Sequence, residues 1–78
     1  MALSIDQVRQ LVASALEVEV GLVSADTKAG DLELWDSLGH ISILSEIDRV
    51  FGGVSERCPQ LASANSVQEI YDALLEVV

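Results

Sequence analysis

The sequence predicts a small all-α protein: a four-helix bundle of three longer helices and one short helix, with a long ordered loop between helices 1 and 2. Three stretches carry apolar residues at helical spacing, and no segment alternates apolar and polar residues as a half-exposed strand would. The chain has 78 residues, a length that suits one domain, which we place over residues 1–78.

A first amphipathic helix is expected over residues 4–17. Ser4 and Gln7 have the spacing of a capping box, in which each side chain bonds the other's backbone amide. Apolar residues then recur at helical steps: Ile5, Val8, Leu11, Val12, Ala15 and Leu16. The polar residues between them, Arg9 included, are expected to face water.

Residues 18–35 lose the helical period and contain the turn formers Gly21 and Gly30. The segment exceeds the ~12–15 residues usual for a connection, and such long loops are typically functional or disordered. Because apolar residues are scattered through it, up to Trp35, we expect an ordered loop lying across the core.

A second helix is expected over residues 37–51. Asp36 is suited to cap its first turn, and Gly52-Gly53 is suited to end it in a left-handed conformation. On a helical wheel, one half gathers the apolar residues that should face the core: Ile41, Ile43, Leu44, Ile47, Val50 and Phe51. Leu38 falls in the opposite, polar half and is expected to be exposed.

The last third of the chain predicts two helices. Cys58-Pro59 opens a short helical turn, with proline at its first position. Ser66 and Glu69 form a second capping-box pattern. The stripe of the final helix follows at residues Val67, Ile70, Tyr71, Leu74 and Val78.

Charge and composition exclude several classes of function. Thirteen acidic against four basic residues give a net charge of −9, which argues against nucleic-acid binding and favours partners with basic patches. The single cysteine, Cys58, cannot form an internal disulfide, which suits a reducing compartment. No apolar stretch approaches the ~20 residues of a membrane span, and no signal peptide is visible. We therefore expect a cytoplasmic monomer without membrane insertion.

An enzyme is the least favoured reading of the polar residues. Asp36, Ser37 and His40 are close in sequence, but a nucleophile elbow requires glycine where Trp35 stands, and no strand precedes it. One histidine and one cysteine cannot supply a zinc site, so no metal is expected. His40 is expected at the edge of the apolar arc, with its ring packed and a nitrogen reaching water.

Ser37 stands at the first turn of the second helix, where a hydroxyl is accessible and the helix dipole favours a phosphate ester. On the dipeptide alone, Asp36-Ser37 is better explained as an ordinary helix start, because both residues favour that position. The exposed Leu38 beside it is a candidate docking contact.

These residues resemble a known family, the acyl carrier proteins. Asp36-Ser37-Leu38 looks like the family's attachment motif, and Phe51-Gly52 looks like its helix-ending pair at the same separation. Length, acidity and the placement of all four helices extend the resemblance over the whole chain. It implies that Ser37 carries 4′-phosphopantetheine, which a phosphopantetheinyl transferase installs from coenzyme A with Mg²⁺ bound at the transferase. The arm's thiol would then hold acyl groups as thioesters for partner enzymes.

Several positions depart from the fatty-acid members of that family. Trp35 replaces a small residue, and Gly39-His40 replaces an acidic-threonine pair. The expected acidic run reads Ser42, Asp48, Arg49 and Val50 instead. These departures favour a specialised, stand-alone carrier in a fatty-acid-like or polyketide-like pathway. A discrete aminoacyl or peptidyl carrier remains open, as does an unmodified helical interaction module.

The expected partners, besides the transferase, are loading and condensing enzymes with basic patches. We expect Leu38 to supply an apolar docking contact, and Glu46 with Asp48 to steer the encounter electrostatically. Arg49 would repel enzymes that expect a carboxylate at its position. Alternatively, Arg49 is a solvated cation that suits the C-terminal end of the helix dipole.

Overall fold

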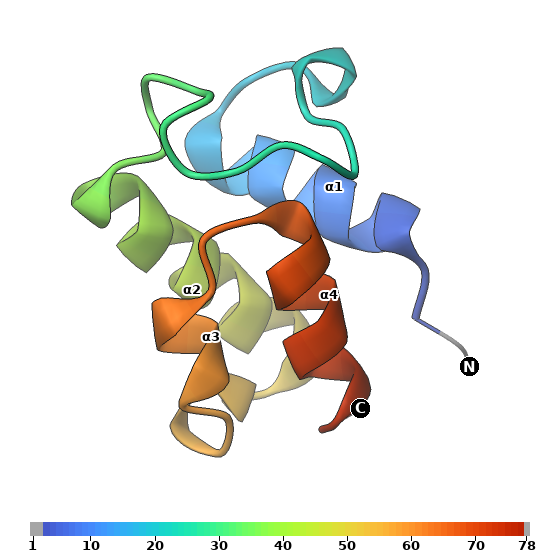
Figure 1. The fold of residues 1–78 in the computed structure, drawn as a ribbon. Helices are drawn as coiled ribbons and strands as arrows, with labels where there is room; N and C mark the ends of the chain where they lie inside the picture. The colour runs from blue at the N-terminus through green and yellow to red at the C-terminus, as the bar shows by residue number, and fades with distance from the viewer. Residues whose placement is uncertain (1–2, 78) are drawn as a thin grey trace.

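The computed structural model describes residues 3–77, which form helices and no strand. Its elements are α1 (Ile5–Leu16), η1 (Val20–Leu22), α2 (Ser37–Phe51), η2 (Val54–Glu56), α3 (Gln60–Ser63) and α4 (Val67–Leu75). The predicted all-α fold is confirmed: α1 packs against both α2 and α4, and α3 is a single turn between α2 and α4 (Figure 1). None of the helices in residues 3–77 combines the length and apolarity needed to cross a bilayer.

The ends of α1 follow from local signals. Ser4 Oγ accepts a hydrogen bond from the Gln7 amide at 3.2 Å, and Gln7 Oε1 accepts one from the Ser4 amide at 2.8 Å, which confirms the capping box. Glu17 leaves the helix in a left-handed conformation, with φ of 57°, and the Val18 amide bonds the Ala13 carbonyl. The helix therefore begins and ends one residue inside the predicted 4–17.

The second capping box is only half right. Ser66 Oγ accepts from the Glu69 amide at 3.1 Å, as predicted, but Glu69 Oε1 accepts from the Asn65 amide, one residue before the cap. Pro59 also lies one position earlier than predicted, because α3 begins at Gln60 and Pro59 precedes it as the cap residue. The described part of α4 ends at Leu75, and the predicted stripe residue Val78 lies outside the described residues.

The core is one cluster of aliphatic side chains from α1, α2, α4 and the loops. Ile43 and Ile47 are fully buried, and Leu44 and Phe51 are half-buried, as the helical wheel predicts. The wheel is wrong for Ile41 and Val50, which are 58% and 50% exposed. Ile41 is exposed because α3, only four residues long, does not cover that flank of the fifteen-residue α2, whereas Val50 lines an open groove with residues of α1.

The segment between α1 and α2 is ordered and lies across the core, as predicted. Val23, Thr27 and Trp35 are buried. Two backbone hydrogen bonds tie the loop to the α3–α4 connection: the Ala29 amide to the Asn65 carbonyl at 2.7 Å, and the Val67 amide to the Thr27 carbonyl at 2.9 Å. The loop thus positions the first turn of α4 as well as the first turn of α2.

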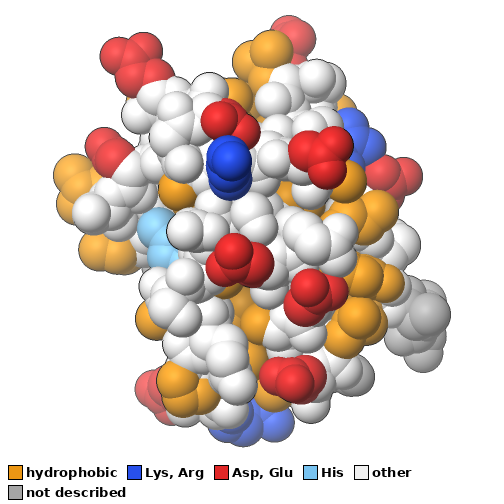
Figure 2. Space-filling model, viewed as in Figure 1, with side chains coloured by type: hydrophobic (Ala, Val, Ile, Leu, Met, Phe, Trp, Pro, Cys, Tyr) orange, Lys and Arg blue, Asp and Glu red, His pale blue; other side chains and the backbone are white. Residues whose placement is uncertain are grey.

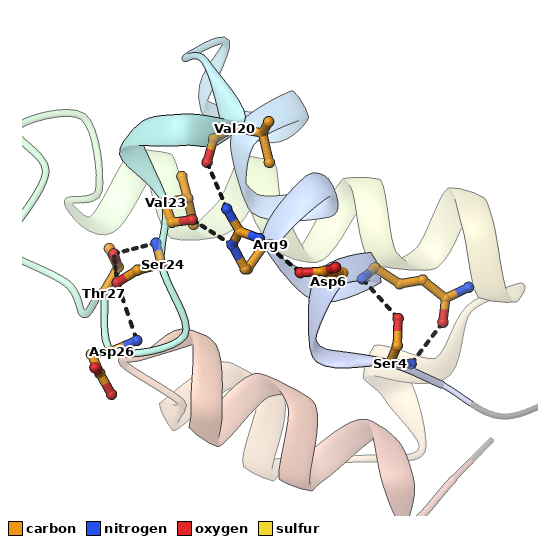
Figure 3. A network of polar contacts seen from close by, with 9 residues as sticks. Ser4, Asp6, Arg9, Val20, Val23, Ser24, Asp26 and Thr27 are labelled. Carbon is orange, nitrogen blue, oxygen red and sulfur yellow. Dashed lines mark hydrogen bonds and ion pairs between the residues drawn. The ribbon is translucent and has the colours of Figure 1, made fainter.

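Arg9 anchors the start of this loop, contrary to the prediction that it faces water (Figure 3). Its Nε donates to the Val23 carbonyl at 2.6 Å and its Nη2 to the Val20 carbonyl at 3.3 Å, while Nη1 pairs with Asp6 at 2.7 Å. Its side chain is only 28% exposed. The guanidinium therefore binds the Val23 carbonyl directly after η1 and shares the Val20 carbonyl with the Val23 amide.

Replacing Arg9 by methionine is expected to lower the free energy of unfolding by about 1–2 kcal/mol, because two backbone carbonyls lose a charged donor while the apolar stem is kept. Urea denaturation measures the loss. Asp6→Asn, which removes only the exposed ion pair, is the control and should change stability by less than about 0.5 kcal/mol. Equal losses in the two variants would show that the carbonyl contacts contribute nothing.

Candidate functional site

Ser37 is the first residue of α2 and is exposed. Asp36, directly before it, has extended backbone, and its Oδ1 accepts a hydrogen bond from the Gly39 amide at 2.9 Å. The predicted cap is therefore confirmed, and it frees the Ser37 hydroxyl from that role. The first amides of a helix have no carbonyl partner within the helix, so the amides of Ser37 and Leu38 remain free of intrahelical bonds.

Gly39 fixes how the loop meets α2. It is buried, and a Cβ at this position would lie 2.0 Å from the Leu34 carbonyl oxygen and 3.0 Å from Leu16 Cδ2. Only a glycine lets the last turn of the loop rest on the first turn of the helix. Gly39 was predicted only as a departure from the family motif, although a glycine inside a predicted helix also signals the close approach of another segment.

Trp35 and His40 form a hydrogen-bonded chain that reaches α3. Trp35 Nε1 donates to His40 Nδ1 at 3.1 Å, and His40 Nε2 lies 2.8 Å from the Leu61 carbonyl oxygen. Because an indole N–H can only donate, Nδ1 is the acceptor and the proton is on Nε2, which donates to Leu61. The two rings are nearly parallel, at 7°, with centroids 6.3 Å apart.

The prediction that a ring nitrogen of His40 reaches water is thus wrong, since both nitrogens have partners inside the protein. The partners come from elements that the helical wheel does not contain. Trp35 belongs to the loop, and Leu61 belongs to a single-turn helix, where its carbonyl also accepts from the Ala64 amide.

An open groove of about 610 Å³ runs from Ser37 between α2 and the chain around α3. Ser37, His40, Ile41 and Leu44 line it from α2, and residues 62–65 line it from the opposite side. Trp35 is also among its lining residues. The accessible hydroxyl therefore opens onto a mostly apolar surface.

Apolar side chains are also exposed around Ser37. Leu38 is 75% exposed, which confirms the prediction for this residue. Leu34 and Ile41 are 54% and 58% exposed and were not predicted as surface residues. Leu38 and Ile41 are three residues apart, so they are neighbours on the surface of α2. We call Leu34, Leu38 and Ile41 the apolar rim.

Glu46 and Arg49 lie farther along α2 and bind each other. Arg49 Nη2 and Nε contact the two carboxylate oxygens of Glu46 at 2.7 and 3.1 Å, and Ser14 Oγ also donates to Glu46 at 3.2 Å. The hydrogen bonds with Arg49 lower the pKa of Glu46 and raise that of Arg49. The roles of Glu46 in steering and of Arg49 in partner discrimination stay predictions, and both charges belong to one local pair.

Asp48 stabilises the turn that follows α2. Its two carboxylate oxygens accept from the Ser55 amide at 2.8 Å and from Ser55 Oγ at 2.6 Å. Both bonds lower the pKa of Asp48, and the bond from the Ser55 hydroxyl has the larger effect. At 1.5 Å per residue, Asp48 is about 16 Å along the helix from Ser37. Its role in steering stays a prediction.

The Asp48–Ser55 bonds predict a pH dependence of stability. The pKa is lower in the folded state, so this contribution is fully present above the ordinary value of 3.8 and is lost as the pH falls through the folded-state value. From about pH 5 downward, the free energy of unfolding should fall more steeply for wild type than for Asp48→Asn. Urea denaturation across this range measures both slopes. Ser55→Ala should give an intermediate slope, and parallel slopes for wild type and Asp48→Asn would contradict the assignment.

The described residues bring together no group of three or more His, Cys, Asp or Glu side chains that could hold a metal ion. Cys58 is buried, and its Sγ lies 3.6 Å from the Ala73 carbonyl oxygen. Comparison with protein-family models, curated proteins and solved structures finds no significant match to this chain.

Proposed function

We propose that the chain is a carrier protein that holds acyl groups as thioesters on a 4′-phosphopantetheine arm attached to Ser37. The observation that carries this proposal is an exposed serine hydroxyl at the first position of α2, beside the Asp36 cap and opening onto an apolar groove. The Asp36-Ser37-Leu38 sequence resembles the attachment motif of acyl carrier proteins.

The residues present fit a phosphodiester at Ser37. Its oxygens would lie at a helix N-terminus, where the dipole favours an anion and the amides of Ser37 and Leu38 have no helical acceptor. The Asp36 carboxylate accepts a hydrogen bond from the Gly39 amide, and this bond partly offsets its negative charge beside the phosphate. When bound, the group supplies a terminal thiol for thioester formation.

Attachment is a group transfer onto this chain. Ser37 Oγ forms a bond to the phosphorus on the pantetheine side of coenzyme A, the phosphoanhydride bond breaks, and adenosine 3′,5′-bisphosphate leaves. The hydroxyl proton passes to a base of the phosphopantetheinyl transferase, which also holds the Mg²⁺. The chain is thus a substrate and shuttle in the cytoplasm and not an enzyme.

Partner enzymes would dock around the arm. The apolar rim offers contacts beside Ser37, and the net charge of −9 attracts basic surfaces. Figure 2 shows acidic side chains spread over one face of the molecule, with few basic ones among them. Loading and condensing enzymes of a fatty-acid-like or polyketide-like pathway fit this description, as do those that act on aminoacyl carriers.

The test is modification in vitro. The purified chain is incubated with a broad-specificity phosphopantetheinyl transferase, coenzyme A and Mg²⁺, and its intact mass is measured. We expect the gain of one prosthetic group, its complete loss in Ser37→Ala, and its retention in Ser45→Ala, an exposed serine on the same helix. A wild type that stays unmodified, or a Ser37→Ala variant that is modified, would contradict the proposal.

The apolar rim also supports a second candidate, an interaction module in which Ser37 is never modified. This candidate predicts no mass change in the same assay, so one experiment separates the two. Circular dichroism should show an intact helical fold in Ser37→Ala under either candidate, because Asp36 still provides the cap.

A further inference from the structure

We propose, as an extension that rests on the carrier function, that Trp35 and His40 form a fixed floor beneath the groove at Ser37. The floor confines an acyl cargo to the surface groove, because it closes the space between α2 and α3 to an alkyl chain. Trp35 and His40 are then positioning residues that determine where the cargo lies.

The floor is built from residues that line the groove on one side and contact the core on the other. Trp35 and His40 both line the groove, yet Trp35 is only 2% exposed. Their near-parallel rings are joined by the bond from Trp35 Nε1 to His40 Nδ1. The bond from His40 Nε2 to the Leu61 carbonyl extends the floor to α3.

Space beneath the floor is already filled. Ile43 of α2, Leu61 of α3 and Leu74 of α4 are all fully buried members of the core cluster. A chain that entered between the helices would have to displace these side chains from a close-packed interior.

Opening the floor is costly. Moving His40 breaks two hydrogen bonds and leaves the Trp35 N–H, on a nearly fully buried side chain, without an acceptor. Leaving a buried donor unsatisfied lowers the population of an opened state by between about fivefold and about 150-fold. The floor should therefore stay closed when cargo is attached.

The groove above the floor has room for an acyl chain. Its volume of about 610 Å³ lies in the ~300–1,000 Å³ range of small-molecule sites, and it is open to water. Ile41 and Leu44 give it an apolar wall on the α2 side. An acyl chain that lies on this wall keeps its other side in water, so each added methylene buries only part of its surface.

The test is a chain-length series on the intact carrier. Ser37 is loaded by the transferase with coenzyme A analogues that carry acetyl, butyryl or octanoyl groups through a stable amide in place of the thioester. Mass spectrometry confirms each product, and urea denaturation gives its folding equilibrium constant. Each methylene that became buried would raise this constant about fourfold.

For the wild type, four half-buried methylenes should give a folding constant about 16-fold larger for the octanoyl form than for the butyryl form, with no change in Trp35 fluorescence between them. In His40→Ala, which opens the floor, fuller burial should raise this ratio at least fivefold. A purely structural role for His40 would lower stability equally in all forms and leave this ratio unchanged.

Two results would overturn the floor: a wild-type octanoyl form stabilised more than a hundredfold over the butyryl form, or the same octanoyl-to-butyryl ratio in His40→Ala as in wild type. If His40→Ala does not fold, Trp35→Phe replaces it. This variant keeps a ring but removes the N–H donor to His40, so an unchanged ratio there would also count against the hydrogen-bonded floor. Failure of every analogue to load onto wild type would instead refute the carrier function itself.

Discussion

Replacing Trp35 by alanine is expected to lower the free energy of unfolding by about 3–5 kcal/mol. The indole is 2% exposed and belongs to the core cluster, so its removal leaves a large cavity beneath the loop. It also removes the donor to His40 Nδ1. A chain of 78 residues has a total stability of only about 4–12 kcal/mol, so this variant should be close to unfolded at ordinary temperature.

Urea denaturation followed by circular dichroism measures this loss, because the variant has no other tryptophan to report by fluorescence. Trp35→Phe is the matched control. It keeps most of the buried apolar area and should cost about 1–2 kcal/mol, chiefly through the lost hydrogen bond. A loss below about 1 kcal/mol in Trp35→Ala would show that the loop does not depend on this side chain.

Gly39→Ala is expected to lower the free energy of unfolding by about 1–3 kcal/mol, even though alanine is the better helix former by about 1 kcal/mol. The added methyl group would meet the Leu34 carbonyl oxygen at 2.0 Å, a backbone atom that cannot rotate away. The loop must shift off α2, and we also expect slower modification of Ser37, two residues away.

The matched control is Gly21→Ala, because a Cβ at Gly21 meets nothing within 4 Å. Its stability should stay within about 0.5 kcal/mol of wild type, and its rate of modification should not change. Thermal or urea denaturation of both variants makes the comparison. Equal stabilities would show that the contact between Leu34 and Gly39 relaxes without cost.

Features set by neighbouring residues were predictable from the sequence. The bounds of α2 match the prediction because Asp36 and Gly52 each determine one end through local hydrogen bonds and backbone conformation. The exposure of Leu38 and the position of Ser37 follow from the same helix register. The candidate serine could therefore be identified without a structure.

Features set by distant residues were not predictable. The exposure of Ile41 depends on how little of α2 the short α3 covers, which no helical wheel contains. Arg9 bonds carbonyls 11 and 14 residues away, and its predicted exposure was wrong for that reason. The groove at Ser37 is likewise formed with residues 62–65, which only the tertiary fold brings to α2.

The most direct test of the carrier function is the mass of the protein isolated from its own host, followed by peptide mapping of the modified form. We predict a 4′-phosphopantetheine adduct on the peptide that contains Ser37, with or without a thioester-linked acyl group. A protein that is entirely unmodified at Ser37 under conditions that preserve such adducts, or that carries the adduct on another residue, would contradict it.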